Sequence, residues 1–130
     1  SRGLGDVYKR QDMNAEITVE LLGFHGFDVD RVKDGAECVS ALEKAQPGYY
    51  CLILMDIQMP NMNGYTAAER IRAMPDSTKA GIPIIAMTAN AFDDDKKAAF
   101  QAGMNGHISK PIEFDSMMQM IRKFIGQGGE

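Results

Sequence analysis

The fold is decided by residues 52–60, which read LILMDIQMP. Four apolar residues stand in a row before Asp56, and such a run without alternation is typical of a strand that is covered on both faces of a parallel sheet. Pro60 cannot donate to a β-ladder, so the strand must end before it. Asp56 would then stand at the carboxyl end of a strand, where open parallel sheets bind their ligands. On this stretch alone, the simpler interpretation is that Asp56 caps a turn or the next helix.

The composition is that of one small globular domain. The 130 residues suffice for one hydrophobic core and are too few for two ordinary domains. No apolar run approaches the length that spans a bilayer, so we expect no membrane segment. A net charge of −4 without a basic stripe argues against direct binding of nucleic acid. Cys38 and Cys51 lack a CxxC spacing, which favours reduced core thiols and a cytoplasmic location.

Apolar spacing predicts helices and strands that alternate along the chain. Helical spacing begins at Asp12 and ends at Gly23. Later helices are expected at residues 34–46, 64–74 and 93–103 and over the apolar face at 117–125, and strands at 27–33, 51–55, 83–88 and 107–109. This order demands right-handed crossovers. It predicts an α/β fold, a doubly wound parallel five-stranded sheet with helices on both faces.

Residues 1–11 (SRGLGDVYKRQ) fit this order poorly. They show no periodicity, and their end resembles a translated transposase end sequence of the kind used in sequencing libraries. A sheet that starts with a helix lacks the strand before that helix, and residues 1–11 are a poor candidate for it. We therefore expect 1–11 to be a non-native leader in place of an atypical or degraded first strand, 12–125 to be the domain, and 126–130 a flexible tail.

Three successive strands are expected to end in polar residues, namely Asp56, Thr88 and Lys110. The carboxyl ends of parallel strands lie along one edge, so these side chains would converge on one site. A carboxylate can attack phosphorus to form an acyl phosphate, and a hydroxyl and an ammonium can bind phosphoryl oxygens. Mg²⁺ normally completes the charge neutralisation, here with oxygens from Asp56 and from the backbone near Gln58.

The sequence resembles the receiver domains of two-component response regulators, and most closely those attached to hybrid histidine kinases. The motifs are LILMDIQMPNMNGY at 52–65, PIIAMTANAF at 83–92 and AGMNGHISKPI at 102–112, within a match from about Asp12 to Ile125. The resemblance implies a flavodoxin-like, CheY-like fold. It also implies a cytoplasmic signalling switch, not an enzyme, that is phosphorylated on Asp56 by a histidine kinase or a histidine phosphotransfer domain.

The family's metal-holding residues are altered in this chain. The family ends its first strand in an acidic pair that holds Mg²⁺, and alignment on Met13-Asn14 puts Lys9 and Arg10 there. Cations at that place repel a divalent metal and supply no ligand. Asp12 can substitute in part if the chain shifts. We therefore expect Mg²⁺ to be held weakly or not at all, by Asp56, Gln58 and Asp12, and phosphorylation to be impaired.

The predicted switch residues are Thr88 and His107. In the family, a hydroxyl residue at the position of Thr88 moves toward the phosphoryl group. His107 stands where family members usually carry a Tyr or Phe that turns inward at the same time. A histidine ring can rotate and pack in the same way. No acid at an informative spacing would make His107 a catalytic base.

Two other classes of function remain open on the sequence. A non-phosphorylated pseudo-receiver would act through its helical surface and bind no magnesium. An aspartate-nucleophile phosphatase of the haloacid dehalogenase type would need an acid two residues after Asp56, where Gln58 stands. Gln58 and Asn90 would instead tune how water reaches the phosphoryl group. Nothing in the sequence specifies an oligomeric state.

Overall fold

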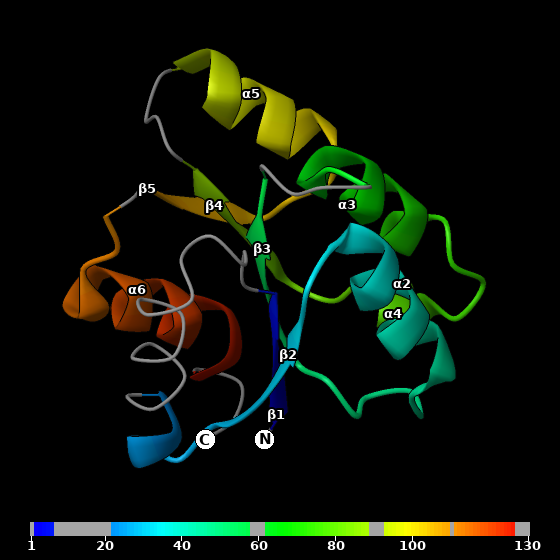
Figure 1. The fold of residues 1–130 in the computed structure, drawn as a ribbon, viewed down its shortest axis with the longest axis horizontal. Coiled ribbons are helices and arrows are strands. Elements are labelled where there is room, and N and C mark those ends of the chain that lie inside the picture. Colours follow the sequence, from blue (N-terminus) through cyan, green and yellow to red (C-terminus); the bar gives the residue numbers. More distant parts are fainter. Residues whose placement is uncertain (1, 7–21, 58–61, 89–92, 110, 127–130) are drawn as a thin grey trace.

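The computed structural model describes residues 2–6, 22–57, 62–88, 93–109 and 111–126. These residues form a five-stranded, wholly parallel sheet in the order β2-β1-β3-β4-β5 (Figure 1). The strands are β1 (Arg2–Asp6), β2 (Asp28–Val32), β3 (Ile53–Asp56), β4 (Ile84–Thr88) and β5 (Gly106–Ser109). The predicted doubly wound sheet is confirmed. Its strand order is the flavodoxin-like one, which reverses between β1 and β3.

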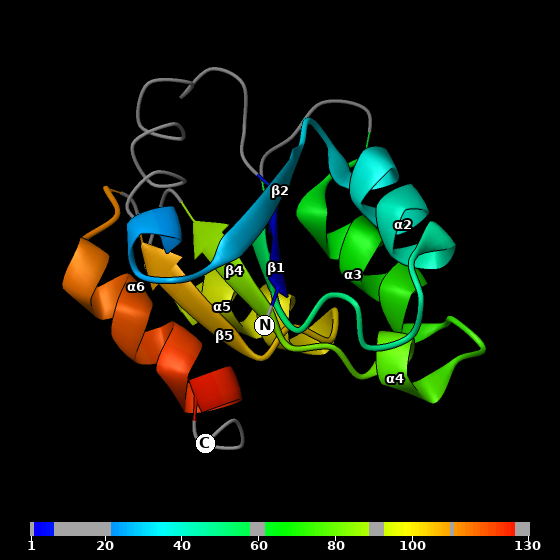
Figure 2. The ribbon, with the colours of Figure 1, turned by 90° about the horizontal axis from the view of Figure 1, so that it is seen from below.

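Helices cover both faces of the sheet. They are α2 (Gly35–Lys44), α3 (Gly64–Arg72), α4 (Ser77–Ala80), α5 (Asp93–Gln101) and α6 (Phe114–Ile121), which continues into the π-helical turn η2 (Arg122–Gly126). Figures 1 and 2 show α2, α3 and α4 on one side of the sheet and α6 on the other. The single turn α4 lies in a stretch that the sequence predicts as a polar connector. Its cap is local, because the Asp76 carboxylate accepts a hydrogen bond from the Lys79 amide.

The apolar run of β3 is buried on both faces, as predicted. Ile53 and Met55 belong to the cluster beneath α2 and α3, whereas Leu52 and Leu54 belong to the cluster beneath α6. Successive side chains of a strand point to opposite faces, so a strand between two helical layers must be apolar at every position. β4 follows the same rule, and all of its residues are buried.

The start of α2 confirms the capping box that the sequence predicts. The Asp34 carboxylate accepts a hydrogen bond from the Glu37 amide at 2.9 Å, and the Glu37 carboxylate accepts one from the Lys33 amide at 2.9 Å. Both bonds satisfy amides that a helix start leaves without an intrahelical partner. Asp34 is therefore buried for a structural reason.

β1 corrects one expectation about residues 1–11. Arg2–Asp6 pairs in parallel with β2 and with β3, at Asp6↔Val32 and Asp6↔Met55. The judgement that residues 1–11 are a poor candidate for the first strand is therefore wrong. Without β1, the facing N–H and C=O groups of β2 and β3 would lack partners, so pairing prevails over a sequence with low strand propensity. The strand is assigned to Asp6, and Lys9 and Arg10 lie outside the described residues, so their place beside the metal site stays a prediction.

Other predictions about the chain ends fall largely outside the described residues. The non-native origin of residues 1–11 stays a prediction, and the helix predicted from Asp12 to Gly23 is described only from Leu22, which is buried. Gly126 belongs to η2, and the rest of the predicted tail is not described. Among the described residues, no helix is long and apolar enough to cross a membrane.

Candidate functional site

Asp56 is the last residue of β3, in the middle of the sheet, and only 1% of its surface is exposed. β1 pairs with one side of its strand, and β4 pairs with the other at Asp56↔Met87. Asp56 does not cap the helix that follows. That role belongs to Asn63, whose side-chain oxygen accepts a hydrogen bond from the Thr66 amide at 2.9 Å. The interpretation that Asp56 caps the next helix is therefore wrong, and a role in capping the turn is not tested, because residues 58–61 lie outside the described residues. Burying a carboxylate costs free energy, which favours a functional reason for its place.

Thr88 ends the neighbouring strand and is 3% exposed. Because Asp56 is paired with Met87, Thr88 stands one residue beyond Asp56 on the adjacent strand, and adjacent strands are about 4.8 Å apart. The ladder continues past Asp56, since the Ile57 amide donates to the Met87 carbonyl at 3.2 Å. The structure thus brings two of the three predicted phosphoryl-binding residues to one place.

The third strand end at this edge belongs to β5. Thr88 is paired with Ser109, the last residue of β5. Lys110 follows Ser109 in the sequence but lies outside the described residues. Its predicted contact with a phosphoryl group therefore stays a prediction, as does the role of Asn90 in admitting water.

Gly64 brings the start of α3 against the end of β3. A Cβ at Gly64 would lie 2.9 Å from the Asp56 carbonyl oxygen and 2.9 Å from the Ile57 Cα. The Gly64 amide also donates to the Ile57 carbonyl at 3.0 Å. The start of α3 at Gly64 therefore lies against the end of β3. Sequence reasoning assigned Gly64 no role, although a glycine directly after the capping Asn63 was the available signal.

The predicted magnesium ligands are only partly described. Of the predicted ligands, Asp56 is described, whereas Gln58 and Asp12 lie outside the described residues. The register of β1 adds Asp6, which stands at the carboxyl end of its strand opposite Met55. Sequence reasoning missed this position because only strand pairing reveals it. Among the described residues, no group of three or more His, Cys, Asp or Glu forms a metal-binding cluster. Mg²⁺ is commonly held by one or two carboxylates with waters and phosphate, and the carboxylate of Asp56 is chemically suited to be one of them.

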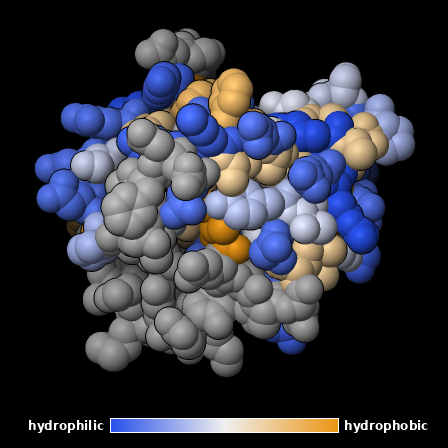
Figure 3. Space-filling view, turned by 90° about the horizontal axis from the view of Figure 1, so that it is seen from above, coloured by the Kyte–Doolittle hydropathy of each residue, from blue (hydrophilic) through white to orange (hydrophobic). Residues whose placement is uncertain are grey.

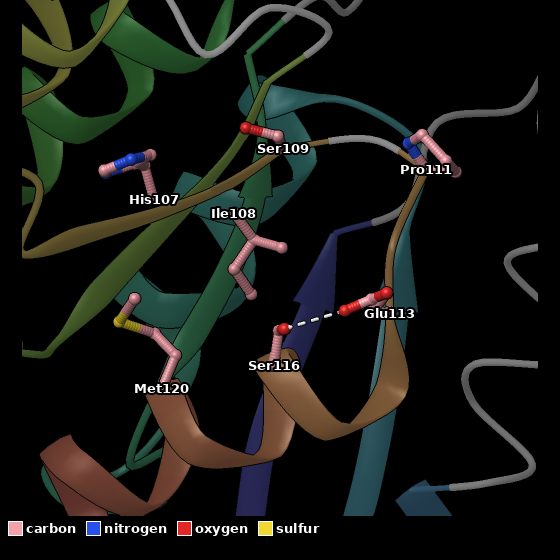
Figure 4. Close-up of a pocket in the computed structure, with 7 residues that line it drawn as sticks. All are labelled: His107, Ile108, Ser109, Pro111, Glu113, Ser116 and Met120. Carbon is pink, nitrogen blue, oxygen red and sulfur yellow. Dashed lines mark hydrogen bonds between the residues drawn. The ribbon is translucent and has the colours of Figure 1, made fainter.

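His107 lies on β5 and lines two hollows of about 510 and 120 Å³. Figure 4 shows Ile108 pointing toward Met120 of α6, whereas His107 points to the other side of the strand. Burial lowers the pKa of His107 below its usual value, and the nearby positive charge of Lys96 lowers it further. The ring is therefore neutral at neutral pH. Its predicted part in switching is not tested by one conformation. The larger hollow is lined by His107, Ile108, Ser109, Pro111, Glu113, Ser116 and Met120.

The face of the molecule drawn in Figure 3 is mostly hydrophilic where its residues are described. Figure 3 shows small apolar areas separated by polar and charged residues. Large apolar side chains that are exposed, such as Phe24 and Phe100, occur singly along the chain. Scattered apolar residues are normal on a protein surface and do not by themselves mark a binding site.

Comparisons with known proteins agree with this geometry. The family model for the response regulator receiver domain matches residues 10–122. Hybrid signal transduction histidine kinase L of Dictyostelium discoideum is 36% identical over 134 residues, which cover 99% of this chain and 8% of the kinase. Probable histidine kinase 2 of Oryza sativa subsp. indica is 43% identical over 104 residues, covering 79% of this chain and 10% of that protein. The chain thus spans a tenth or less of either relative.

A solved structure of similar sequence shares the whole fold. It is the receiver domain of a sensor histidine kinase from Pseudomonas aeruginosa PAO1, with a magnesium ion coordinated in its active site cleft. The two chains are 32% identical, with a TM-score of 0.80, and the match covers 96% of this chain and 97% of the other. The likeness extends over the sheet and the helices on both of its faces.

Proposed function

The chain belongs to the response regulator receiver domain family, and we propose that it accepts a phosphoryl group on Asp56 in a histidine-to-aspartate phosphorelay. The donor would be the phosphohistidine of a histidine kinase or of a histidine phosphotransfer domain. The observation that carries this proposal is the burial of Asp56 and Thr88 at adjacent strand ends on one edge of the sheet. The chain would act as a signalling switch and not as an enzyme with turnover of its own.

The proposed transfer uses Asp56 as the nucleophile. One carboxylate oxygen attacks the phosphorus atom, the P–N bond to the donor histidine breaks, and the departing imidazole nitrogen takes up a proton. The product is an acyl phosphate on Asp56. The Thr88 hydroxyl would donate a hydrogen bond to one phosphoryl oxygen, and the Lys110 ammonium would pair with another.

A bound Mg²⁺ would add charge neutralisation at the phosphoryl oxygens. Asp56, the backbone carbonyl near Gln58 and the carboxylate at the end of β1 would hold it. We propose that this half of the site is weak. β1 ends in the single acid Asp6, and the next charged residues in the sequence are the cations Lys9 and Arg10. Fewer carboxylates and nearby positive charge both lower the affinity for a divalent cation.

Phosphorylation would switch the edge of the sheet formed by β4 and β5. It adds about −1.5 to −2 charges at neutral pH, which favours any arrangement that brings hydrogen-bond donors to the phosphoryl group. Thr88 is the donor on β4, and His107 is the ring on β5 that lines two hollows. A two-state change of this edge would transmit the signal.

The test is to incubate the chain with Mg²⁺ and a small acyl phosphate donor, and to follow the intact mass. We expect slow addition of one phosphoryl group, which hydroxylamine removes because the product is an acyl phosphate. The matched control is Asp56→Asn, which we expect to stay unmodified. Modification of Asp56→Asn to the same extent would place the phosphoryl group elsewhere and contradict the proposal. Complete failure of the chain to react, with no effect of magnesium, would favour the pseudo-receiver instead.

A further inference from the structure

Arg72, the last residue of α3, donates hydrogen bonds to two other segments of the chain, the end of α4 and the turn at residues 103–105. Its Nε donates to the Gly103 carbonyl at 2.8 Å, its Nη1 to the Ala80 carbonyl at 2.6 Å, and its Nη2 to the Asn105 Oδ1 at 2.7 Å. The guanidinium is partly buried, and this burial lowers its pKa from the usual value, although it stays charged at neutral pH. Charged donors held in a planar fork form strong hydrogen bonds of fixed direction.

Asn105 connects the Arg72 side chain to the start of β4 through hydrogen bonds. Its Oδ1, which Arg72 holds, also accepts a hydrogen bond from the Ile84 amide at 2.8 Å, and its own amide donates to the Ile84 carbonyl at 2.7 Å. Ile84 is the first residue of β4, and Asn105 directly precedes β5. Both backbone groups of Ile84 are therefore bonded to one residue, whose side chain is fixed by Arg72.

Gly103 shows that the turn is built around the arginine. Its backbone is left-handed, with a φ of +102°, and a Cβ there would lie 2.7 Å from the Arg72 Cγ. An L-residue would be strained in this conformation and would also push the arginine stem aside. The glycine thus lets the Arg72 side chain lie against the turn that leads into β5.

The register of β5 depends on its ladder with β4, on the burial of Ile108 against α6 and on the hydrogen bonds just before its first residue. β5 is short, it lies at an edge of the described sheet, and it pairs with β4 alone, from Ile85↔Gly106 to Thr88↔Ser109. A slip of one residue would turn every β5 side chain to the opposite face. The hydrogen bonds between Asn105 and Ile84 lie just before the first of these pairs, and the Thr88–Ser109 pair is the last.

We propose that Arg72, acting through Asn105, is a positioning residue for the phosphoryl end of the sheet. It sets the register of β5 on β4 and thereby the place of the Thr88–Ser109 pair, at the opposite end of the ladder from Arg72 itself. The inference rests on the proposed function, because it assigns Arg72 a part in phosphoryl transfer without contact to the phosphoryl group.

The experiment compares Arg72→Met, which keeps the apolar stem and removes the donors, with Arg70→Met on the exposed face of the same helix. Amide hydrogen exchange gives a measure that needs no phosphorylation. We expect exchange at Ile108, whose amide faces β4, to become about tenfold faster in Arg72→Met, as expected for loss of charge-assisted hydrogen bonds, with Leu54 and Met55 of β3 much less affected. Arg70→Met should match the unaltered chain.

Phosphorylation kinetics then test the positioning role. At saturating phosphodonor, the maximal rate of acyl phosphate formation should fall about tenfold in Arg72→Met, while the donor concentration for half-maximal rate changes less than twofold. Asn105→Asp keeps the acceptor for both Arg72 and Ile84 and should stay within about twofold of the unaltered chain, whereas Asn105→Leu should behave as Arg72→Met does. If Arg72→Met does not fold, the two Asn105 variants decide the question.

The outcomes separate the inference from the proposed function. An unaltered chain that never forms an acyl phosphate contradicts the proposed function, and the exchange data then decide only the register. A folded Arg72→Met with unchanged β5 exchange and an unchanged maximal rate overturns the inference while the proposed function stands. Faster exchange spread equally over β3 and β5 shows a general loss of stability and also overturns it.

Discussion

β1 and β3 lie side by side in the sheet, and they differ in what makes them strands. Every residue of β3 is buried, and its apolar side chains belong to the hydrophobic clusters on both faces. β1 has the sequence RGLGD and lies between β2 and β3 through backbone pairing in a register that both neighbours share. The strand that carries the nucleophile is therefore fixed by the burial of its side chains. β1, which ends beside the part of the site proposed to hold Mg²⁺ (the metal half), is paired through its backbone with both neighbours.

This comparison explains which half of the site tolerates change. Removing buried side chains costs more free energy than losing one hydrogen bond of a ladder, because the first leaves a cavity and the second exchanges a protein partner for water. Substitutions in β3 should therefore affect the stability of the whole domain. Substitutions in β1 should chiefly affect the metal half.

The largest expected effect is on β3. Ile53→Ala removes a side chain with no exposed surface and should lower the free energy of unfolding by about 2–5 kcal/mol. Chemical denaturation measures it. Phe24→Ala is the control, because Phe24 is 89% exposed and its loss should change the stability by less than about 0.5 kcal/mol. Equal losses in the two variants would show that β3 is not supported by burial.

The contact between α3 and the end of β3 should be nearly as sensitive. Gly64→Ala introduces a Cβ at 2.9 Å from the Asp56 carbonyl oxygen, and we expect a loss of about 1–3 kcal/mol together with slower phosphorylation of Asp56. Denaturation and the phosphorylation rate test both effects. Gly23→Ala is the matched control, since a Cβ at Gly23 would meet nothing within 4 Å. A variant as stable and as reactive as the control would refute the close approach.

A smaller effect is expected in β1. Gly5→Pro removes an amide from a strand that is paired on both sides, at Arg31 and at Leu54, and should cost about 1–2 kcal/mol. Hydrogen exchange should report greater loss of protection in β2 than in β4. Gly5→Ala keeps the amide and should leave the exchange pattern unchanged. Uniform loss of protection across the sheet would contradict the separation of the two halves.

The smallest effect concerns His107. Its folded pKa lies below the ordinary value of 6.5, so the unfolded chain takes up the proton first as the pH falls. The stability should therefore fall as the pH drops from 6.5 toward the folded pKa and change little from this cause above 6.5. Lys96→Ala should raise the pKa of His107, because it removes the smaller of the two causes. A titration of the ring by nuclear magnetic resonance checks this, and an unchanged or lower pKa would show that Lys96 has no such effect.

The sequence predicts the parts of this molecule that depend on patterns within one segment. The unbroken apolar run before Asp56 marks a strand buried on both faces, and the spacing of Asp34 and Glu37 marks a capped helix start; the structure has both. Asp56 and Thr88 were found in the same way, because each ends such a run.

The features that escaped prediction depend on contacts between distant segments. β1 forms a strand because its backbone pairs with both β2 and β3. The residues of β1 themselves do not indicate a strand. Asp6 stands beside the end of β3 through that register alone. Arg72 looks like an ordinary surface cation of a helix, and its function as an anchor becomes visible only when α3, the turn at Gly103 and Asn105 are placed together.

The magnesium dependence of Asp56 phosphorylation tests most directly the claim that the nucleophile half is intact while the metal half is weak. The rate with a small phosphodonor is measured over a range of Mg²⁺ concentrations for the unaltered chain and for the double variant Lys9→Glu with Arg10→Asp. We predict that the half-saturating concentration falls at least about tenfold in the double variant, equivalent to about 1.4 kcal/mol, while Asp56 remains the modified residue in both. Equal half-saturating concentrations in the two chains would contradict the account.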